Sequence, residues 1–153
     1  MIMSALNLFF STPVWVFRVP DYENVNNMVY DYIKSLQSLD NDGVVKSNIK
    51  GWHSKDFNLK EKIPQSFINK ISPHIQSVIN DMDWDNSNQS VKISNMWAIV
   101  NKGGAANHRH HHGNSDISAA YYVRAPKQSG EIVFYDPRPA PVFLIQSLIN
   151  QTN

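Results

Sequence analysis

The sequence predicts an α+β domain in which two helices pack against one side of an antiparallel β-sandwich. Apolar residues recur at helical spacing in two segments of the first half, and a period of two begins near Val91. Gly and Pro turns then separate three further short runs that are rich in β-branched and aromatic residues. Because no repeat or linker interrupts this order, we expect a single domain over residues 1–153.

Both predicted helices have recognisable starts. The first has a plausible cap at Asp21 and ends at the turn Asp40–Gly43. Its apolar stripe consists of Val25, Met28, Val29, Tyr32, Ile33 and Leu36. The second begins at Pro64, where a first helical turn accepts proline, and Pro73 should kink or divide it. Its stripe consists of Phe67, Ile68, Ile71, Ile75, Val78, Ile79 and Met82. Between the helices, an ordered loop is expected around Gly51-Trp52-His53-Ser54.

Five strands are predicted. Val14–Val19, between two prolines, suits an early edge strand. Residues 91–100 alternate strictly, so this strand should have two differently lined faces. The remaining strands are expected at Ile117–Arg124, Glu131–Tyr135 and Val142–Ile145.

The composition argues against several classes of protein. Fourteen basic and thirteen acidic side chains give a formal charge of +1, which offers no electrostatic basis for a nucleic-acid partner. The N-terminal apolar run is broken by Asn7, Ser11 and Pro13, so neither a signal peptide nor a membrane span is expected. The chain has no cysteine, which fits a reducing, cytoplasmic location and requires any transition-metal site to use His, Asp or Glu.

A histidine segment, Asn107–His112, holds four of the six histidines. If it is extended, His108, His110 and His112 lie on one face and His111 on the other. Neutral imidazoles at positions i and i+2 can share iron, zinc, copper or nickel if a third ligand comes from elsewhere. The alternatives are a solvated polar loop and an engineered tag, although a tag would lie at a terminus. Spacing alone does not choose the metal.

The ordered combination of four motifs resembles a known family. These are Leu8-Phe9-Phe10-Ser11-Thr12-Pro13-Val14-Trp15, Gly51-Trp52-His53-Ser54, Met96-Trp97-Ala98-Ile99-Val100-Asn101-Lys102-Gly103 and, above all, His110-His111-His112-Gly113-Asn114-Ser115-Asp116-Ile117-Ser118-Ala119-Ala120-Tyr121-Tyr122-Val123. The exit Ser129–Pro139 completes them. The chain resembles the 2-oxoglutarate–Fe(II) oxygenases common in marine bacteria and their phages, which are related in fold to prolyl hydroxylases.

The resemblance implies a double-stranded β-helix core of the jelly-roll or cupin-like kind, with the two N-terminal helices packed on one sheet. It also implies Fe(II) and 2-oxoglutarate as cofactors and hydroxylation of an unknown small-molecule or peptide substrate. In the superfamily a His-x-Asp or His-x-Glu pair and a distal His hold the iron. The matching pair is His110 and His112, and His108 is a spare ligand.

The sequence departs from the family pattern in two ways. His112 occupies the carboxylate position, which makes the site richer in imidazole and poorer by one negative charge. The core is expected to be incomplete, because the strands with the distal His and the cosubstrate-binding Arg or Lys do not follow before Asn153. A third ligand would then come from His53, His74, His108, another chain, or nowhere.

Three residues are candidates for binding the cosubstrate. Tyr121 and Tyr122 face opposite sides of their strand, so at most one reaches the interior and core packing is the simpler role. Arg138 follows Pro137 in a turn and could bind an anion or form a salt bridge. Trp52 and Trp97 are most simply core aromatics.

Three functions remain open on the sequence. The first is an Fe(II)- and 2-oxoglutarate-dependent dioxygenase. The second is a truncated or degenerate β-helix module without catalysis, which binds metal weakly and dimerises to cover its open sheet edges. The third is a cupin-like site that binds zinc or nickel without oxidation.

Overall fold

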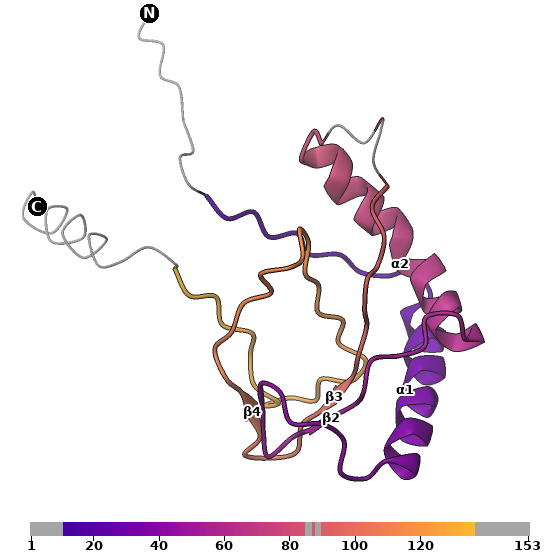
Figure 1. Ribbon diagram of the computed structural model, residues 1–153, viewed down its shortest axis with the longest axis vertical. Coiled ribbons are helices and arrows are strands. Elements are labelled where there is room, and N and C mark those ends of the chain that lie inside the picture. Colours follow the sequence, from indigo (N-terminus) through magenta and orange to yellow (C-terminus); the bar gives the residue numbers. More distant parts are fainter. Residues whose placement is uncertain (1–10, 85–86, 88–89, 137–153) are drawn as a thin grey trace, which may run out of the picture.

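The structure is a computed structural model that describes residues 11–84, 87 and 90–136. In this part of the chain the elements, in order, are α1 (Tyr22–Leu39), β1 (Asn48–Ile49), β2 (Trp52–His53), α2 (Lys62–Asp81), β3 (Ile99–Val100) and β4 (Ala106–Asn107). The two helices pack against each other, and extended segments lie beside them (Figure 1). The predicted α+β class is therefore confirmed.

Helix α1 begins where its cap was predicted, but the cap works differently from the expected one. Asp21 is the residue before the helix, and its backbone is left-handed, with φ 55°. Its carboxylate accepts a hydrogen bond from the Asn24 side-chain amide at 2.6 Å, and none from a helix backbone N–H. The helix buries Val25 and Val29, which belong to the predicted stripe.

Helix α2 confirms the role predicted for Pro64, which lies in its first turn and is buried. Of the two outcomes expected at Pro73, a kink or a division of the helix, division does not occur, because α2 continues through it. Proline removes one backbone hydrogen bond, yet buried residues on both sides of it, Phe67 before and Val78 and Ile79 after, fix both halves of the helix by packing.

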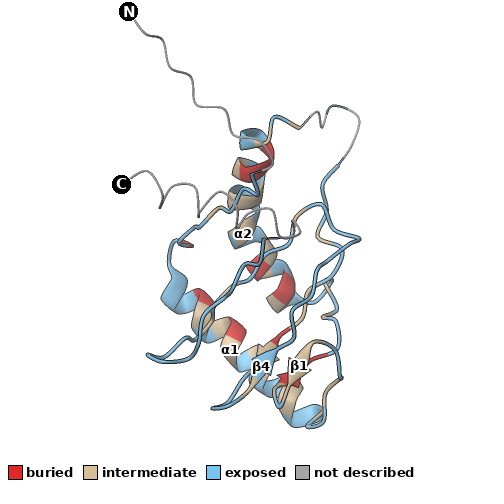
Figure 2. Ribbon diagram, turned by 90° about the vertical axis from the view of Figure 1, so that its left-hand side faces the viewer, coloured by how far each residue is buried: buried red, intermediate tan, exposed pale blue. Residues whose placement is uncertain are grey.

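The core lies between the helices and two extended segments. Val19, Val25, Val29 and Phe67 form its buried centre, and Met96, Tyr121 and Val123 are among the half-buried residues packed against it. Figure 2 shows buried positions on both helices, whereas most of the extended segments are exposed. The helices therefore lie on one side of the extended segments, but the described residues form two separate two-stranded sheets in place of the predicted β-sandwich.

Two short antiparallel sheets hold the middle of the chain. Trp52 pairs with Val100 and His53 with Ile99, while β1 pairs with β4. The region around Gly51-Trp52-His53-Ser54 was expected to be an ordered loop, and that expectation was wrong because Trp52–His53 forms strand β2. Backbone hydrogen bonds continue beyond β2, with Ser54 N–H donating to the Ala98 carbonyl at 2.9 Å and Phe57 N–H to the Met96 carbonyl at 2.7 Å.

Three predicted strands do not form as hydrogen-bonded strands, and the strand predicted at residues 91–100 is reduced to β3, Ile99–Val100. Val14–Val19 instead packs its side chains on α2: the Trp15 indole N–H donates to an Asp81 carboxylate oxygen at 2.9 Å, and Phe17 lies against His74. Ile117–Arg124 is likewise unpaired, although the alternation of half-buried Tyr121 and Val123 with exposed Tyr122 matches the prediction.

The third of these, Glu131–Tyr135, is exposed along its length. A strand needs a neighbouring backbone, and the hydrogen bonds of the described residues supply none for these segments. The predicted strand Val142–Ile145 lies outside the described residues. Within the described ranges, neither helix has an apolar stretch that could cross a bilayer.

Candidate metal centre

Strands β2 and β3 carry different side chains on their two faces. Met96 packs against the helical core and Ala98 is buried, so Trp97 between them faces the other side. His53 is directly opposite Ile99, which makes Trp97 its diagonal neighbour on the same face. The His53 and Trp97 rings are stacked, with centroids 5.7 Å apart and planes 11° apart. The predicted alternation of faces is therefore confirmed at residues 96–98.

Hydrogen bonds fix the His53 side chain from behind. His53 is 5% exposed and its Nδ1 lies 2.6 Å from the Ser54 carbonyl oxygen. A carbonyl only accepts, so Nδ1 carries the proton. Ser54, 3% exposed, donates its own N–H to the Ala98 carbonyl and accepts the Ala98 N–H on Oγ at 2.9 Å. His53 thus belongs to a rigid, buried corner of the fold.

The histidine segment begins at Asn107, the last residue of β4, and is exposed. The His108 N–H donates to the Ser47 carbonyl at 2.7 Å, which fastens the start of the segment to the chain before β1. The His110 and His112 rings meet edge to face, with centroids 4.9 Å apart. His110 Nδ1 lies 2.7 Å from the His108 carbonyl, so its Nε2 holds the free lone pair.

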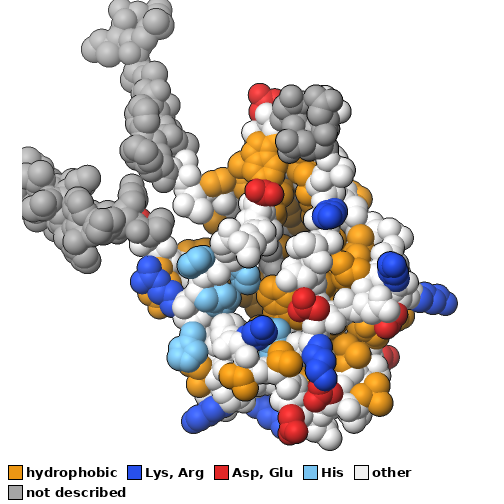
Figure 3. Space-filling view, viewed as in Figure 1, with side chains coloured by type: hydrophobic (Ala, Val, Ile, Leu, Met, Phe, Trp, Pro, Cys, Tyr) orange, Lys and Arg blue, Asp and Glu red, His pale blue; other side chains and the backbone are white. Residues whose placement is uncertain are grey.

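Trp97 joins these two groups of imidazoles. Its ring lies 5.7 Å from that of His112, with the planes inclined by 33°. His53, Trp97, His112 and His110 therefore form one continuous line of ring contacts, which we call the histidine–tryptophan row. Histidine side chains gather on one face of the molecule in Figure 3.

The donors in this row suit a borderline transition metal only in part. Two neutral imidazoles that touch each other match the ligand chemistry of iron, zinc, copper or nickel. Among residues 11–84, 87 and 90–136, however, no group of three His, Asp or Glu side chains is placed to hold a metal ion. The described residues therefore supply a ligand pair and leave the set incomplete.

Residues 95–153 resemble a known oxygenase family. The model of a family described as "Putative 2OG-Fe(II) oxygenase" matches this stretch, which includes Trp97 and the whole histidine segment. Such a family implies Fe(II) and 2-oxoglutarate as cofactors. No curated protein and no solved structure matches the chain. The similarity therefore covers less than half of the chain, the C-terminal part that carries His110 and His112.

The predicted cosubstrate residues lie in different surroundings. The Tyr121 hydroxyl donates to the Asn26 side-chain oxygen at 2.7 Å, and its ring lies 4.9 Å from that of Phe67. Burial raises the pKa of Tyr121. Tyr122 is exposed on the opposite side. Arg138 lies outside the described residues. Tyr121 is thus engaged in the helical core, whereas the Tyr122 side chain is open to a ligand.

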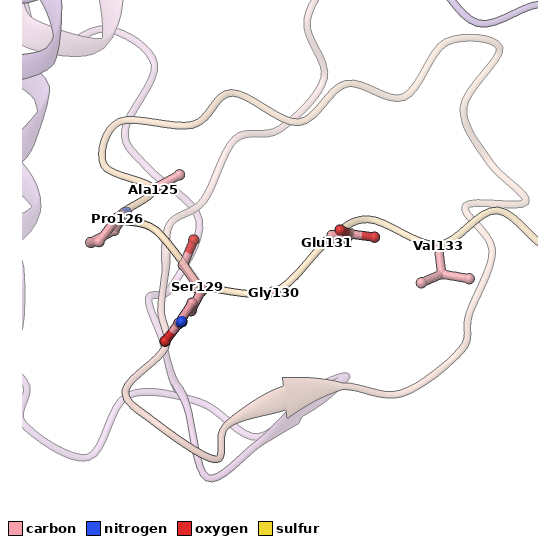
Figure 4. A pocket seen from close by; sticks show the side chains of 7 residues that line it. Ala125, Pro126, Ser129, Gly130, Glu131 and Val133 are labelled. Carbon is pink, nitrogen blue, oxygen red and sulfur yellow. The ribbon is translucent and has the colours of Figure 1, made fainter.

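Two other features lie apart from the row. A hollow lined by Ala125, Pro126 and Ser129–Glu131 is built from one turn of the chain and holds no imidazole (Figure 4). His74, on α2, has its ring against Phe17 at 4.9 Å. Neither feature adds a ligand to the His110–His112 pair.

Sequence reasoning missed two contacts of the site. Trp97 was assigned to the core, whereas it bridges His53 and His112. Its place between the core-facing Met96 and Ala98 in the alternating run was the signal for this. The Arg109 guanidinium lies 4.6 Å from the centre of the Tyr135 ring, a cation–π contact that turns Arg109 away from its histidine neighbours. No sequence pattern predicts the contact between Arg109 and Tyr135.

Proposed function

We propose that this chain is a domain of an Fe(II)- and 2-oxoglutarate-dependent dioxygenase and that His110 and His112 bind its metal. The observation that carries the proposal is the contact between these two imidazole rings, whose centroids are 4.9 Å apart. Both rings lie in the stretch that the oxygenase family model matches. Two imidazoles at positions i and i+2 of an extended segment then act as one bidentate donor.

The hydrogen bond of His110 supports its assignment as a ligand. Nδ1 donates to the His108 carbonyl, which fixes the tautomer and leaves Nε2 unprotonated toward solvent. In metal sites, a hydrogen bond from the ring nitrogen that does not bind the metal orients the ligating imidazole and raises its basicity. The neighbouring His108 remains a spare ligand, since its exposed ring is one residue from Arg109 and two from His110.

The family implies the chemistry that a bound cofactor would supply. Iron with 2-oxoglutarate and dioxygen yields succinate, carbon dioxide and a hydroxylated C–H bond in the substrate. The chain's own residues would hold the metal through His110 and His112, and Tyr122 is exposed and free to meet a cosubstrate. We place this site in a double-stranded β-helix core, with a further ligand from His108 or from another chain.

Anaerobic titration with Fe(II), with and without 2-oxoglutarate, tests this proposal. A weak visible charge-transfer band that saturates at one iron per chain and requires 2-oxoglutarate is the expected result. The band should be lost in His110→Ala and in His112→Ala. It should persist in His111→Ala, the matched control, because no ring contact ties His111 to the row in the described structure.

A non-oxidative metal site is the second candidate, and a specific observation favours it. His112 replaces the carboxylate of the family's ligand pair, and the described residues bring no acid to the two imidazoles. Neutral ligands alone suit zinc or nickel as well as iron. Stoichiometric binding of Zn(II) or Ni(II), with no charge-transfer band and no succinate, would select this candidate over the dioxygenase.

A further inference from the structure

His112 is an exposed imidazole whose ring orientation depends on aromatic contacts. No side-chain hydrogen bond of His112 occurs in the described part of the structure, in contrast to His110, whose Nδ1 is bonded to a carbonyl. Its backbone carbonyl accepts the Ser115 N–H at 3.2 Å, which orders the main chain but leaves the ring free to rotate. The ring contacts with Trp97 and His110 are therefore what restricts it.

Trp97 is itself fixed from the opposite direction. The nearly parallel stack with His53 places a buried, hydrogen-bonded ring against it. The pairing of β2 with β3 and the two hydrogen bonds between Ser54 and Ala98 fix the backbone on both sides of that stack. Trp97 thus has little freedom to follow a rotation of His112.

We propose that His53 and Trp97 are positioning residues that hold the His112 imidazole in the orientation that binds metal. This inference rests on the proposed metal site. An imidazole that is already oriented loses less rotational freedom when it binds, so the buried β2–β3 corner strengthens metal binding at an exposed segment. The stretch matched by the family model begins at residue 95, which places Trp97 inside it and His53 outside.

Direct ligation by His53 is the competing explanation, and the geometry disfavours it. His53 is only 5% exposed, and in the row the Trp97 ring lies between its ring and that of His112. Removing the nitrogens of His53 while keeping a flat ring separates the two roles.

The test is the affinity for Co(II), used alone as the probe, measured by calorimetry on the folded chain without turnover. Trp97→Leu should weaken binding about 10- to 100-fold, the loss typical of residues that orient a ligand. Trp97→Phe and His53→Phe keep a flat ring in the row and should retain most of the affinity. Trp52→Phe is the control, because Trp52 donates to the Asp40 carbonyl at 2.8 Å, away from the row, so it should lower stability and leave affinity unchanged.

Three results would overturn this role. Trp97→Leu could bind Co(II) as tightly as the wild type, or His53→Phe could lose binding as completely as His112→Ala, which would make His53 a ligand. Both leave the proposed metal site intact. A wild-type chain that binds no stoichiometric Co(II) overturns the metal site and the positioning role together.

Proton NMR of the metal-free chain gives a second readout. The His112 ring protons should be shifted by the Trp97 ring current and should move toward free-histidine values in Trp97→Leu. Unchanged His112 signals in that variant would also contradict the positioning role.

Discussion

The two halves of the extended layer differ in what holds them. Residues 52–57 and 96–100 are joined to each other by backbone hydrogen bonds and bury their inward side chains against the helices. Residues 117–136 make side-chain contacts with the rest of the fold at Tyr121 and Val123 and through two arginines that lie on tyrosine rings, Arg109 on Tyr135 and Arg124 on Tyr30. The proposed ligands lie between these halves, so the paired half acts as their support.

The difference in burial between the helical core and the unpaired half predicts a large difference in stability effects. Phe67 in α2 is 7% exposed, whereas Phe134 in the unpaired half is 65% exposed. Phe67→Ala should lower the free energy of unfolding by about 3–5 kcal/mol because it leaves a cavity beside Tyr121. Phe134→Ala should change it by less than about 0.5 kcal/mol. Urea unfolding of both variants measures this, and equal losses would refute the contrast.

A glycine provides the next largest expected effect. Gly43 has φ +64°, and an added Cβ would collide with the His53 carbonyl and the Trp52 ring. Gly43→Ala should therefore cost about 1–3 kcal/mol, since it combines a strained backbone with a shift of β2. Gly103, beside which a Cβ would meet no atom within 4 Å, supplies the matched control. Thermal melts that show the same loss for both alanine variants would contradict this account.

The neighbouring tyrosines should respond differently to loss of their hydroxyl groups. Tyr121→Phe removes the hydrogen bond to Asn26 and should cost about 1 kcal/mol of unfolding free energy. Tyr122→Phe should have no measurable effect, because Tyr122 is exposed. The denaturant midpoints of the two variants measure these losses of stability. A larger loss of stability for Tyr122→Phe than for Tyr121→Phe would contradict the assigned orientations.

The smallest expected effect appears at high pH. Burial, and then the hydrogen bond to Glu61, raises the pKa of Tyr32 to about 12 from 10.0. The folded chain thus holds the phenol proton more tightly than the unfolded chain does. This contribution is complete below pH 10 and is lost as the pH rises toward 12. Tyr32→Phe should show a shallower alkaline loss of stability than the wild type, and an identical slope would exclude the linkage.

The sequence predicted the helices and the alternating faces because these depend on local spacing. Val25 and Val29 of α1 and Phe67 of α2 lie in the predicted stripes, and Met96, Trp97 and Ala98 alternate as expected. Backbone pairing was predicted less well, since it depends on which distant segment lies alongside. Val14–Val19 has strand composition yet packs its side chains on α2, and no local pattern distinguishes the two outcomes.

At the candidate site, too, the contact that depends on local spacing was predicted and the contact that depends on strand register was not. The pair His110 and His112 follows from spacing along an extended segment, and the structure brings the two rings into contact. The stacking of His53 on Trp97 could not be predicted, because it depends on the register that sets His53 opposite Ile99 and diagonal to Trp97. Register is fixed by the packing of both faces, which a single sequence does not show.

The most direct test of the central claim is to follow the imidazole signals of each histidine by NMR during titration with Zn(II), a diamagnetic probe. The account predicts that the His110 and His112 signals change together and saturate at one Zn(II) per chain, while those of His74 stay unchanged. Equal, unsaturable changes across all four histidines of the segment would contradict it and would leave the segment a solvated polar loop.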